Sequence, residues 1–229
     1  MDRDAFLDLL RQHRAIAVIR ASSVEAGLAQ AQAVVAGGLR LLEVTWNSAY
    51  PEQLVYELRQ QLPHCYVGIG TALSITDLKH AAQAGAQFCF CPHTNPALIE
   101  AAHALHCPIV PGALTPNEIM TAWQAGASAV KIFPVRAVGG SSYIRSLQGP
   151  LNHIPLVPTG GVTIENASEM IESGAIAVGL STSLFPKALV DEQNWGAVTA
   201  LADRLTECLS ATDISTPSGD PIFFSNCPA

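Results

Sequence analysis

The chain has 229 residues, of which 49% are hydrophobic and 14% charged, a composition that supports a buried core and excludes an intrinsically disordered chain. Twelve Lys and Arg residues against nineteen Asp and Glu give a net charge of -7 without a basic cluster, so nucleic acid is not expected as a partner. The acidic N-terminal segment does not resemble a secretory signal, and no apolar stretch is long enough to span a bilayer, so we expect a cytoplasmic protein that does not bind membranes.

Strand-like apolar runs alternate with helix-like segments along the chain. An amphipathic segment over residues 4–13 comes first and is expected to cover one end of the fold. Eight strand-like runs follow, at 15–19, 39–44, 66–69, 88–90, 108–110, 129–133, 155–157 and 176–179. Both faces of these runs are apolar, which is typical of a parallel sheet covered by helices. The pattern predicts an α/β protein, a (β/α)8 TIM barrel with a short N-terminal helix.

The boundaries of the helix-like segments repeat along the chain. Helix starts are predicted where a hydroxyl side chain precedes an acid by three residues, at Ser22 with Glu25, Ser74 with Asp77 and Thr115 with Glu118. Helix ends are predicted at the glycines Gly37–Gly38, Gly85, Gly126 and Gly174. The repeated unit predicts a single barrel over 1–210. The stretch 211–229, rich in Ser, Thr, Pro and Gly, is expected to be an extended or mobile C-terminal tail.

Six cysteines lie mostly in apolar stretches, as reduced, buried thiols do. Cys89, Cys91 and His93 alternate along a strand-like run and together offer soft ligands to a metal. The C-x-x-C spacing and the second ligand pair of common metal sites are absent, however. We therefore favour small, core-facing residues and expect no metal.

Lys131 is the clearest catalytic candidate, because it is a charged residue inside an otherwise apolar run. It shares a face with Ala129 and Phe133, and this face should be the barrel interior if Val130 and Ile132 pack against helices. Burial disfavours the ammonium form and favours the neutral, nucleophilic amine that Schiff-base formation needs. The alternative is a structural lysine paired with a carboxylate.

Glu43 stands at the end of the second run and should also point inward, with Leu41 and Thr45. A carboxylic acid in an apolar interior has a raised pKa and can transfer protons. The alternative is a residue that only neutralises Lys131, and one carboxylate can fill both roles. Thr71 ends the third run with a hydroxyl group, which by itself is a weak signal.

Two glycine-containing loops follow the last two runs. Thr159, Gly160 and Gly161 come after the seventh run, and Ser181 comes after the eighth. Loops at these positions form the usual phosphate-binding site of such barrels, although a glycine pair alone also fits a tight turn. Their joint occurrence predicts an anionic, phosphorylated substrate.

Six segments, in order, resemble those of the 2-keto-3-deoxy-6-phosphogluconate (KDPG) aldolase and 4-hydroxy-2-oxoglutarate (KHG) aldolase family. They are AGGLRLLEVT at 36–45, GIGT at 68–71, AGAQF at 84–88, IVPG at 109–112, VKIFP at 130–134 and PTGGV at 158–162. The resemblance implies a homotrimeric class I aldolase that needs no metal or other cofactor. It further implies cleavage of KDPG to pyruvate and glyceraldehyde 3-phosphate, the reaction of the Entner-Doudoroff pathway, or of KHG to pyruvate and glyoxylate.

The resemblance also implies roles for individual residues. Lys131 would form the Schiff base with a 2-oxo acid, and Glu43 would act as general acid and base. Thr71 would orient the pyruvyl part of the substrate. The phosphate would be held by Gly160, Gly161 and Ser181, next to Thr159.

The chain departs from the family pattern at two places. Asn47 stands where family members commonly have an arginine that binds the substrate carboxylate, so a charged contact is replaced by a neutral one. Cys91-Pro92-His93 stands where Ser-Pro-Gly is usual. Arg20, at the end of the first run, is a candidate for the missing charge, and a surface salt bridge is its alternative role.

Two other functions remain open from the sequence. One is a barrel enzyme of another kind, an isomerase or a metal-assisted aldolase that uses Glu43 with Cys91 and His93. The other is a non-catalytic phosphosugar-binding barrel that has lost its activity together with the arginine. The presence of both Lys131 and Glu43 favours the Schiff-base aldolase.

Overall fold

The computed structural model describes residues 1–212, so residues 213–229, which make up most of the predicted tail, lie outside the described part. The strands are β1 (Ala15–Ile19), β2 (Leu41–Thr45), β3 (Tyr66–Gly70), β4 (Cys89–Phe90), β5 (Ile109–Val110), β6 (Gly112–Ala113), β7 (Val130–Ile132), β8 (Leu156–Pro158) and β9 (Val178–Leu180). The helices are α1 (Arg3–His13), α2 (Val24–Ala36), α3 (Pro51–Gln61), α4 (Ile75–Gln83), α5 (Pro96–Ala104), α6 (Pro116–Gln124), the 3-10 helix η1 (Val135–Val138), α7 (Ser141–Leu151), α8 (Ala167–Glu172), α9 (Lys187–Asp191) and α10 (Trp195–Ser210).

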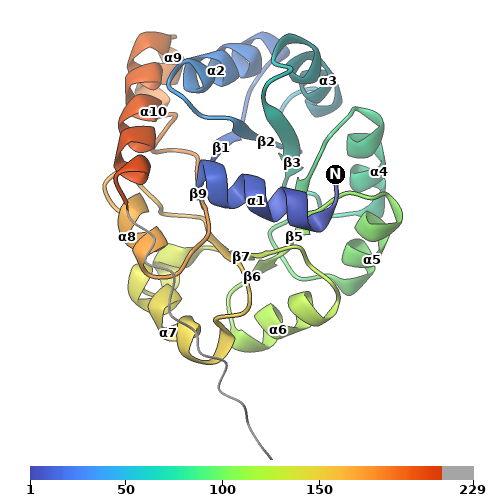
Figure 1. The fold of residues 1–229 in the computed structure, drawn as a ribbon. Coiled ribbons are helices and arrows are strands. Elements are labelled where there is room, and N and C mark those ends of the chain that lie inside the picture. The colour runs from blue at the N-terminus through green and yellow to red at the C-terminus, as the bar shows by residue number, and fades with distance from the viewer. Residues whose placement is uncertain (213–229) are drawn as a thin grey trace, which may run out of the picture.

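All strand pairs in the described residues are parallel. One sheet has the order β5-β4-β3-β2-β1-β9 and the other has the order β6-β7-β8. An isolated parallel bridge between Thr159 and Gly179 connects the end of β8 to β9. Figure 1 shows the curved arrangement of the strands, with helices around them. An α/β fold with parallel strands, as predicted, is therefore present.

The strand-like run predicted at 108–110 was too short. The chain pairs again as β6 after Pro111, which has no N–H to donate and so interrupts the ladder. The carbonyl oxygen of Pro111 nevertheless accepts a hydrogen bond from Lys131 N–H at 2.9 Å. The segment 109–113 thus pairs on one side with β4, through β5, and on the other side with β7, through β6.

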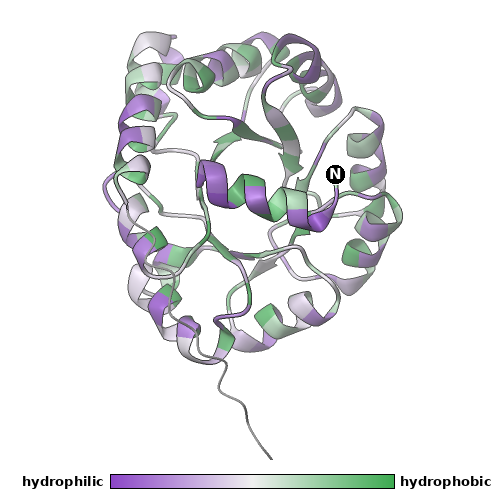
Figure 2. Ribbon diagram, in the orientation of Figure 1, coloured by the Kyte–Doolittle hydropathy of each residue, from purple (hydrophilic) through white to green (hydrophobic). Residues whose placement is uncertain are grey.

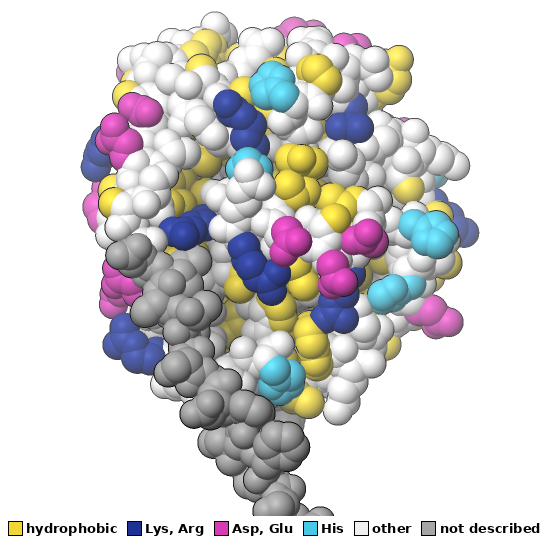
Figure 3. All heavy atoms as spheres, viewed as in Figure 1, with side chains coloured by type: hydrophobic (Ala, Val, Ile, Leu, Met, Phe, Trp, Pro, Cys, Tyr) yellow, Lys and Arg dark blue, Asp and Glu magenta, His cyan; other side chains and the backbone are white. Residues whose placement is uncertain are grey.

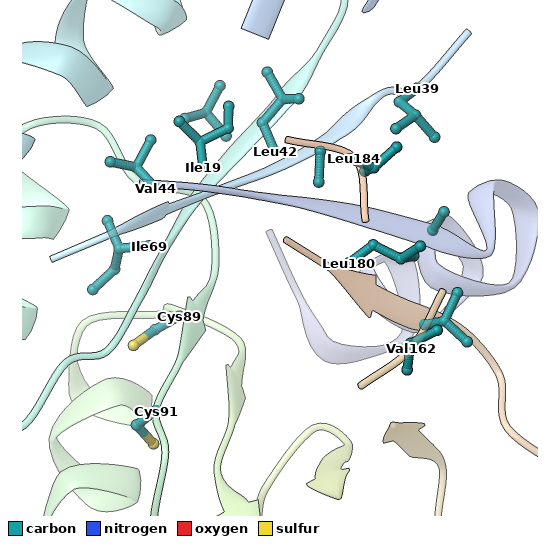
Figure 4. Close-up of a cluster of buried hydrophobic side chains, with 14 of the residues drawn as sticks. Ile19, Leu39, Leu42, Val44, Ile69, Cys89, Cys91, Val162, Leu180 and Leu184 are labelled. Atoms are coloured by element: carbon teal, nitrogen blue, oxygen red, sulfur yellow. The ribbon is translucent and has the colours of Figure 1, made fainter. Parts of the chain in front are cut away.

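Alternate residues of the strands face two different apolar clusters. One cluster lies between strands and helices and includes Ile19, Leu42, Val44 and Ile69 (Figure 4). The other lies inside the curve of the sheet and includes Ile16 and other inward residues. In Figure 2 the strands are mainly hydrophobic, whereas the surrounding helices alternate between hydrophobic and hydrophilic colours. This two-sided burial is the reason for the nearly continuous apolar runs in the sequence.

Helix α1 covers one end of the inner cluster, as predicted. Its residues Phe6, Leu7 and Leu10 are buried in that cluster, and Phe6 stacks on Phe88 with ring centroids 5.3 Å apart. The helix begins after Asp2, whose side chain accepts a hydrogen bond from the backbone N–H at position 5. Figure 1 shows α1 lying across the ends of the strands. Apolar contacts therefore close this end of the interior.

The predicted capping boxes at Ser74 and Thr115 are both present. The cap predicted at Ser22 was wrong by one residue. Ser23 has the extended backbone of an N-cap, and its side chain accepts a hydrogen bond from Ala26 N–H. Two adjacent serines are equivalent as sequence signals, and the backbone angle alone decides between them. The predicted helix-end glycines Gly38, Gly85, Gly126 and Gly174 all have positive φ angles.

No described helix has both the length and the apolar character that crossing a membrane would require. On the face that α1 covers, Lys and Arg side chains are interspersed with Asp and Glu (Figure 3). This face therefore lacks the concentrated positive charge that nucleic acid binding requires.

Candidate active site

Lys131 points into the interior from the middle of β7. Its neighbours Val130 and Ile132 belong to the cluster between strands and helices, whereas Ala129 belongs to the inner cluster, as the period of two predicted. Lys131 is only 5% exposed. Its Nζ atom lies 5.0 Å from the centroid of the Phe133 ring, so aromatic and apolar groups surround most of the amine.

Glu43 points into the same interior from β2 and is 1% exposed. Its Oε1 atom lies 4.0 Å from Lys131 Nζ, which is the distance of an ion pair but is too long for a hydrogen bond. Oε1 has no hydrogen-bond partner within the described part of the chain. Burial raises the pKa of Glu43, while the charges of Lys131 and Arg20 act in the opposite direction. The raised pKa expected from the sequence is thus supported.

Lys131 and Glu43 share a cavity of about 340 Å³ at the carboxyl ends of the strands. Its lining consists of Val18, Arg20, Glu43, Thr45, Thr71, Pro92, Lys131, Phe133, Thr159, Gly160, Gly161, Val162, Gly179, Ser181 and Thr182. Eight of the nine residues proposed from the sequence are in this set. The exception is Asn47, which is exposed and does not line the cavity.

Thr71 enters the cavity from a strained backbone position. Its φ angle is 60°, in the left-handed region that β-branched residues rarely adopt. Such strain persists only where the surrounding structure enforces it, and it is frequent at functional sites. The threonine that gave a weak signal in the sequence is therefore a stronger candidate in the structure.

The loop after β8 is fixed by hydrogen bonds to η1. The carbonyl oxygens of Thr159 and Gly160 accept hydrogen bonds from the backbone N–H groups of Val135 and Arg136, at 2.9 and 3.1 Å. Gly160 and Gly161 have φ angles of 84° and 92°, which a residue with a side chain would adopt only at a cost. The two glycines thus permit a tight turn with close approach of a ligand to the backbone.

Cys91 and His93 do not form a metal site with the catalytic candidates. Cys89 and Cys91 belong to the apolar cluster between strands and helices (Figure 4), and the Cys91 thiol donates a hydrogen bond to the backbone oxygen of His93. Burial raises the pKa of Cys91 to about 11, so the thiol is neutral near pH 7. No three His, Cys, Asp or Glu side chains of residues 1–212 are grouped as metal ligands. The core-facing interpretation favoured from the sequence is confirmed for Cys89 and Cys91 but was wrong for His93, which is only partly buried and belongs to neither core cluster.

Several cavity residues were not proposed from the sequence. Thr45 is the most informative, because it follows Glu43 by two residues and therefore faces the same side of β2. The alternation that identified Glu43 also applied to Thr45. Val18, Val162 and Thr182 gave no comparable signal, since apolar residues and threonines are common at strand ends.

A family model and curated relatives match most of the chain. The family model described as KDPG and KHG aldolase matches residues 7–201. The chain is 32% identical to 2-dehydro-3-deoxy-phosphogluconate aldolase of Pseudomonas aeruginosa over 199 residues, which cover 87% of this chain and 90% of that protein. It is 29% identical to KHG/KDPG aldolase of Escherichia coli, with 84% of this chain and 90% of that protein covered.

A solved structure with the same fold is that of KDPG aldolase from Legionella pneumophila, with pyruvate captured at low pH as a covalent carbinolamine intermediate. It matches with a TM-score of 0.80 and 25% sequence identity, covering 90% of this chain and 98% of that chain. The family model, over residues 7–201, includes all the strands that contribute residues to the cavity, so the similarity is not a local motif alone.

Proposed function

The chain belongs to the KDPG and KHG aldolase family, and on this premise we propose that it is a class I aldolase that cleaves KDPG to pyruvate and glyceraldehyde 3-phosphate. The observation that carries the proposal is the buried pair in the cavity, Lys131 Nζ and Glu43 Oε1, 4.0 Å apart. A nucleophilic amine beside a carboxylic acid of raised pKa is the combination that Schiff-base cleavage of a carbon–carbon bond requires. KHG, cleaved to pyruvate and glyoxylate, is proposed as a second substrate.

In the first stage, the neutral amine of Lys131 attacks the C2 carbonyl carbon of the 2-oxo acid and forms a carbinolamine. Glu43, as the carboxylic acid, then donates a proton to the departing hydroxyl group, so that loss of water gives a protonated Schiff base and leaves Glu43 as the carboxylate. Lys131 is only 5% exposed, and its Nζ atom lies 5.0 Å from the Phe133 ring centroid, so the amine meets the carbonyl carbon in a cavity shielded from water. The positive nitrogen of the Schiff base subsequently accepts the electron pair released by bond cleavage.

In the second stage, the Glu43 carboxylate removes the proton of the C4 hydroxyl group. The C3–C4 bond breaks, the aldehyde leaves, and its electron pair forms the enamine attached to Lys131. Protonation of the enamine at C3 by Glu43, followed by hydrolysis, releases pyruvate and restores the lysine. Since 4.0 Å is longer than a hydrogen bond, the two groups can act on different atoms of one bound substrate.

The remaining cavity residues are proposed to bind the two ends of the substrate. Thr71 orients the pyruvyl part, and its enforced backbone conformation supports a fixed role. At the other end, Thr159, Gly160, Gly161 and Ser181 surround the phosphate. The glycines lack side chains that would keep phosphate oxygens away from backbone N–H groups.

Arg20 is proposed to take the place of the arginine that the sequence lacks at Asn47. Arg20 lines the cavity, and its positive charge is close enough to act on the pKa of Glu43. Asn47 is exposed outside the lining. A guanidinium from β1 can therefore supply the charged contact to the substrate carboxylate that a neutral amide at position 47 cannot.

We also propose that β1 to β9 form a closed (β/α)8 barrel within a single domain over 1–210, with β5 and β6 counted as one strand. The bridge between Thr159 and Gly179 supports closure between β8 and β9. We further propose that the protein is cytoplasmic and forms a homotrimer. The exposed apolar side chains Tyr50, Tyr56 and Leu73, on or near the neighbouring helices α3 and α4, support contact with another subunit.

Trapping with borohydride in the presence of pyruvate tests the proposal. Reduction should fix pyruvate on Lys131, and peptide mass mapping should find the adduct on that residue. The exposed Lys79 and Lys187 serve as internal controls, and Lys187 is already paired with Asp191. Lys131→Ala should abolish both the adduct and turnover. An adduct on a control lysine, or none at all, would refute the proposal.

A further inference from the structure

Ser48 connects the loop after β2 with the loop after β1 by hydrogen bonds. Ser48 itself does not line the cavity. It lies after β2 and is 8% exposed. Its Oγ atom accepts a hydrogen bond from Ala21 N–H at 3.2 Å, from the loop after β1. The same oxygen lies 3.1 Å from Thr45 Oγ1. A second bond, from Ala49 N–H to the carbonyl oxygen of Ala21 at 2.9 Å, completes the connection.

The connection holds the backbone next to Arg20. The peptide group between Arg20 and Ala21 is bound on both sides, because Ser48 accepts its N–H and the side chain of Gln30 donates to its carbonyl oxygen at 3.4 Å. Gln30 is 2% exposed, so this contact is shielded from water. The backbone of Arg20 is therefore fixed, while its side chain extends to the cavity.

Thr45 gives Ser48 a second connection to the cavity. Thr45 is 1% exposed, lines the cavity, and can pair by hydrogen bond with the Ser48 hydroxyl. When Ser48 Oγ accepts from Ala21 N–H, its own hydrogen is available to Thr45 Oγ1. One hydroxyl group thus links the last residue of β2 with the first loop residues after β1.

We infer that Ser48 is a positioning residue for substrate binding, whose hydroxyl group holds Arg20 over the cavity and thereby sets the affinity for the carboxylate of the 2-oxo acid. The inference rests on the proposed role of Arg20 in binding that carboxylate. An arginine whose backbone is fixed loses less conformational freedom when it binds an anion than one on a free loop. Ser48 does not line the cavity, so its effect passes through Arg20.

The first test compares three variants of Ser48 by steady-state kinetics with KDPG. Ser48→Ala should raise KM by about 2- to 10-fold, the equivalent of one hydrogen bond, and should leave kcat nearly unchanged. Ser48→Thr keeps the hydroxyl group and should restore the wild-type KM. Ser48→Cys provides a second variant of similar size, with a weak donor, if Ser48→Ala does not fold. A fall in kcat with constant KM would overturn the inference.

A double-mutant cycle with Arg20 gives the sharper test. In an Arg20→Ala background, Ser48→Ala should change KM by less than about 1.5-fold, because the residue through which it acts is gone. Independent, multiplicative effects would overturn the inference while leaving the aldolase function intact. Wild-type kcat/KM in Arg20→Ala would overturn both the role of Arg20 and the inference, and absence of KDPG cleavage in the wild type would refute the proposed function itself.

Ser173→Ala is the matched control for loss of a buried hydroxyl group. Ser173 is 2% exposed and accepts a hydrogen bond from Arg145 at 3.1 Å, at the end of α8 away from the cavity. Its loss should lower the melting temperature as Ser48→Ala does, but should leave KM unchanged. An equal rise of KM in both variants would mean that reduced stability, not the position of Arg20, is responsible, and this too would overturn the inference.

Discussion

Gly70 on β3 provides the space that the Glu43 carboxylate on β2 occupies. A Cβ atom built on Gly70 would overlap with Glu43 Oε1, the oxygen that faces Lys131. Gly70 pairs with Thr45, two residues beyond Glu43, so the carboxylate leans along its own strand toward the cavity. The absence of a side chain at Gly70, the second glycine of the segment GIGT, is therefore needed to make room for the Glu43 carboxylate.

Gly70→Ala should displace the Glu43 carboxylate and slow the exchange of the pyruvate methyl protons by about 10-fold or more. It should also cost about 1–3 kcal/mol of stability, because a methyl group is forced into a filled space. Exchange is followed by NMR in deuterated water. Gly149→Ala is the matched control, since a Cβ atom there meets nothing within 4 Å. Unchanged exchange in Gly70→Ala would show that the carboxylate has room elsewhere.

Glu43→Gln should separate Schiff-base formation from proton transfer. The neutral amide has nearly the same size but cannot carry a proton, so the borohydride adduct on Lys131 should still form. Exchange of the pyruvate methyl protons should fall by roughly 10²- to 10⁴-fold, the usual contribution of a positioned acid or base. Wild-type exchange in Glu43→Gln would assign Glu43 a purely structural role.

The raised pKa of Glu43 predicts a pH dependence of stability with a definite sign. Below its usual value of 4.5, Glu43 is protonated in both the folded and the unfolded chain. As the pH rises above 4.5, the unfolded chain loses this proton first, so the folded state is progressively destabilised until the pH passes the raised value. Relative to wild type, Glu43→Gln should therefore gain stability as the pH is raised above 4.5, as measured by urea unfolding at a series of pH values from 4.5 upward.

Glu118→Gln should show the opposite trend and serves as the control. Backbone N–H groups of Leu114 and Thr115 lower the pKa of Glu118 below 4.5. The stability that this carboxylate contributes is present above its unfolded pKa and is lost as the pH falls through the lowered value. The difference in unfolding free energy between wild type and Glu118→Gln should thus shrink only at acidic pH. If the differences for Glu118→Gln and Glu43→Gln changed with pH in the same direction, the raised pKa of Glu43 would be contradicted.

Arg20→Ala should lower kcat/KM for KDPG by roughly 10- to 150-fold, the equivalent of one charge-assisted hydrogen bond. Binding of pyruvate should weaken as well, because pyruvate has the carboxylate but no phosphate. Asn47→Ala should have less than a twofold effect, since Asn47 lies outside the cavity lining. The exposed Arg11, paired with Asp8, provides the surface control. A larger loss in Asn47→Ala than in Arg20→Ala would reverse the two assignments.

The phosphate site predicts a preference for KDPG over its unphosphorylated analogue. The difference in kcat/KM should be about 10-fold or more, and sulfate or inorganic phosphate should inhibit competitively. Ser181→Ala should reduce the preference without affecting the pyruvate adduct, because Ser181 lines the cavity and is proposed to bind the phosphate, which pyruvate lacks. Equal kcat/KM for both substrates would favour KHG or another unphosphorylated 2-oxo acid.

Local patterns in the sequence were sufficient for the positions of the strands other than β6 and for the direction of the central side chains. The period of two places Lys131 and Glu43 inside the sheet because one face of each strand packs against helices and the other faces the interior. The capping boxes at Ser74 and Thr115 were predictable for the same reason, since their hydrogen bonds join residues only three positions apart.

Only the tertiary structure decided which residues border the cavity from the loops. Arg20 and Asn47 were both candidates for substrate binding in the sequence and both are exposed, but only Arg20 lines the cavity. Ser48 and Ala21 are 27 positions apart and gave no signal at all. A loop residue has no fixed period, so its direction is set by hydrogen bonds between distant segments, and these exist only once β1 and β2 lie side by side.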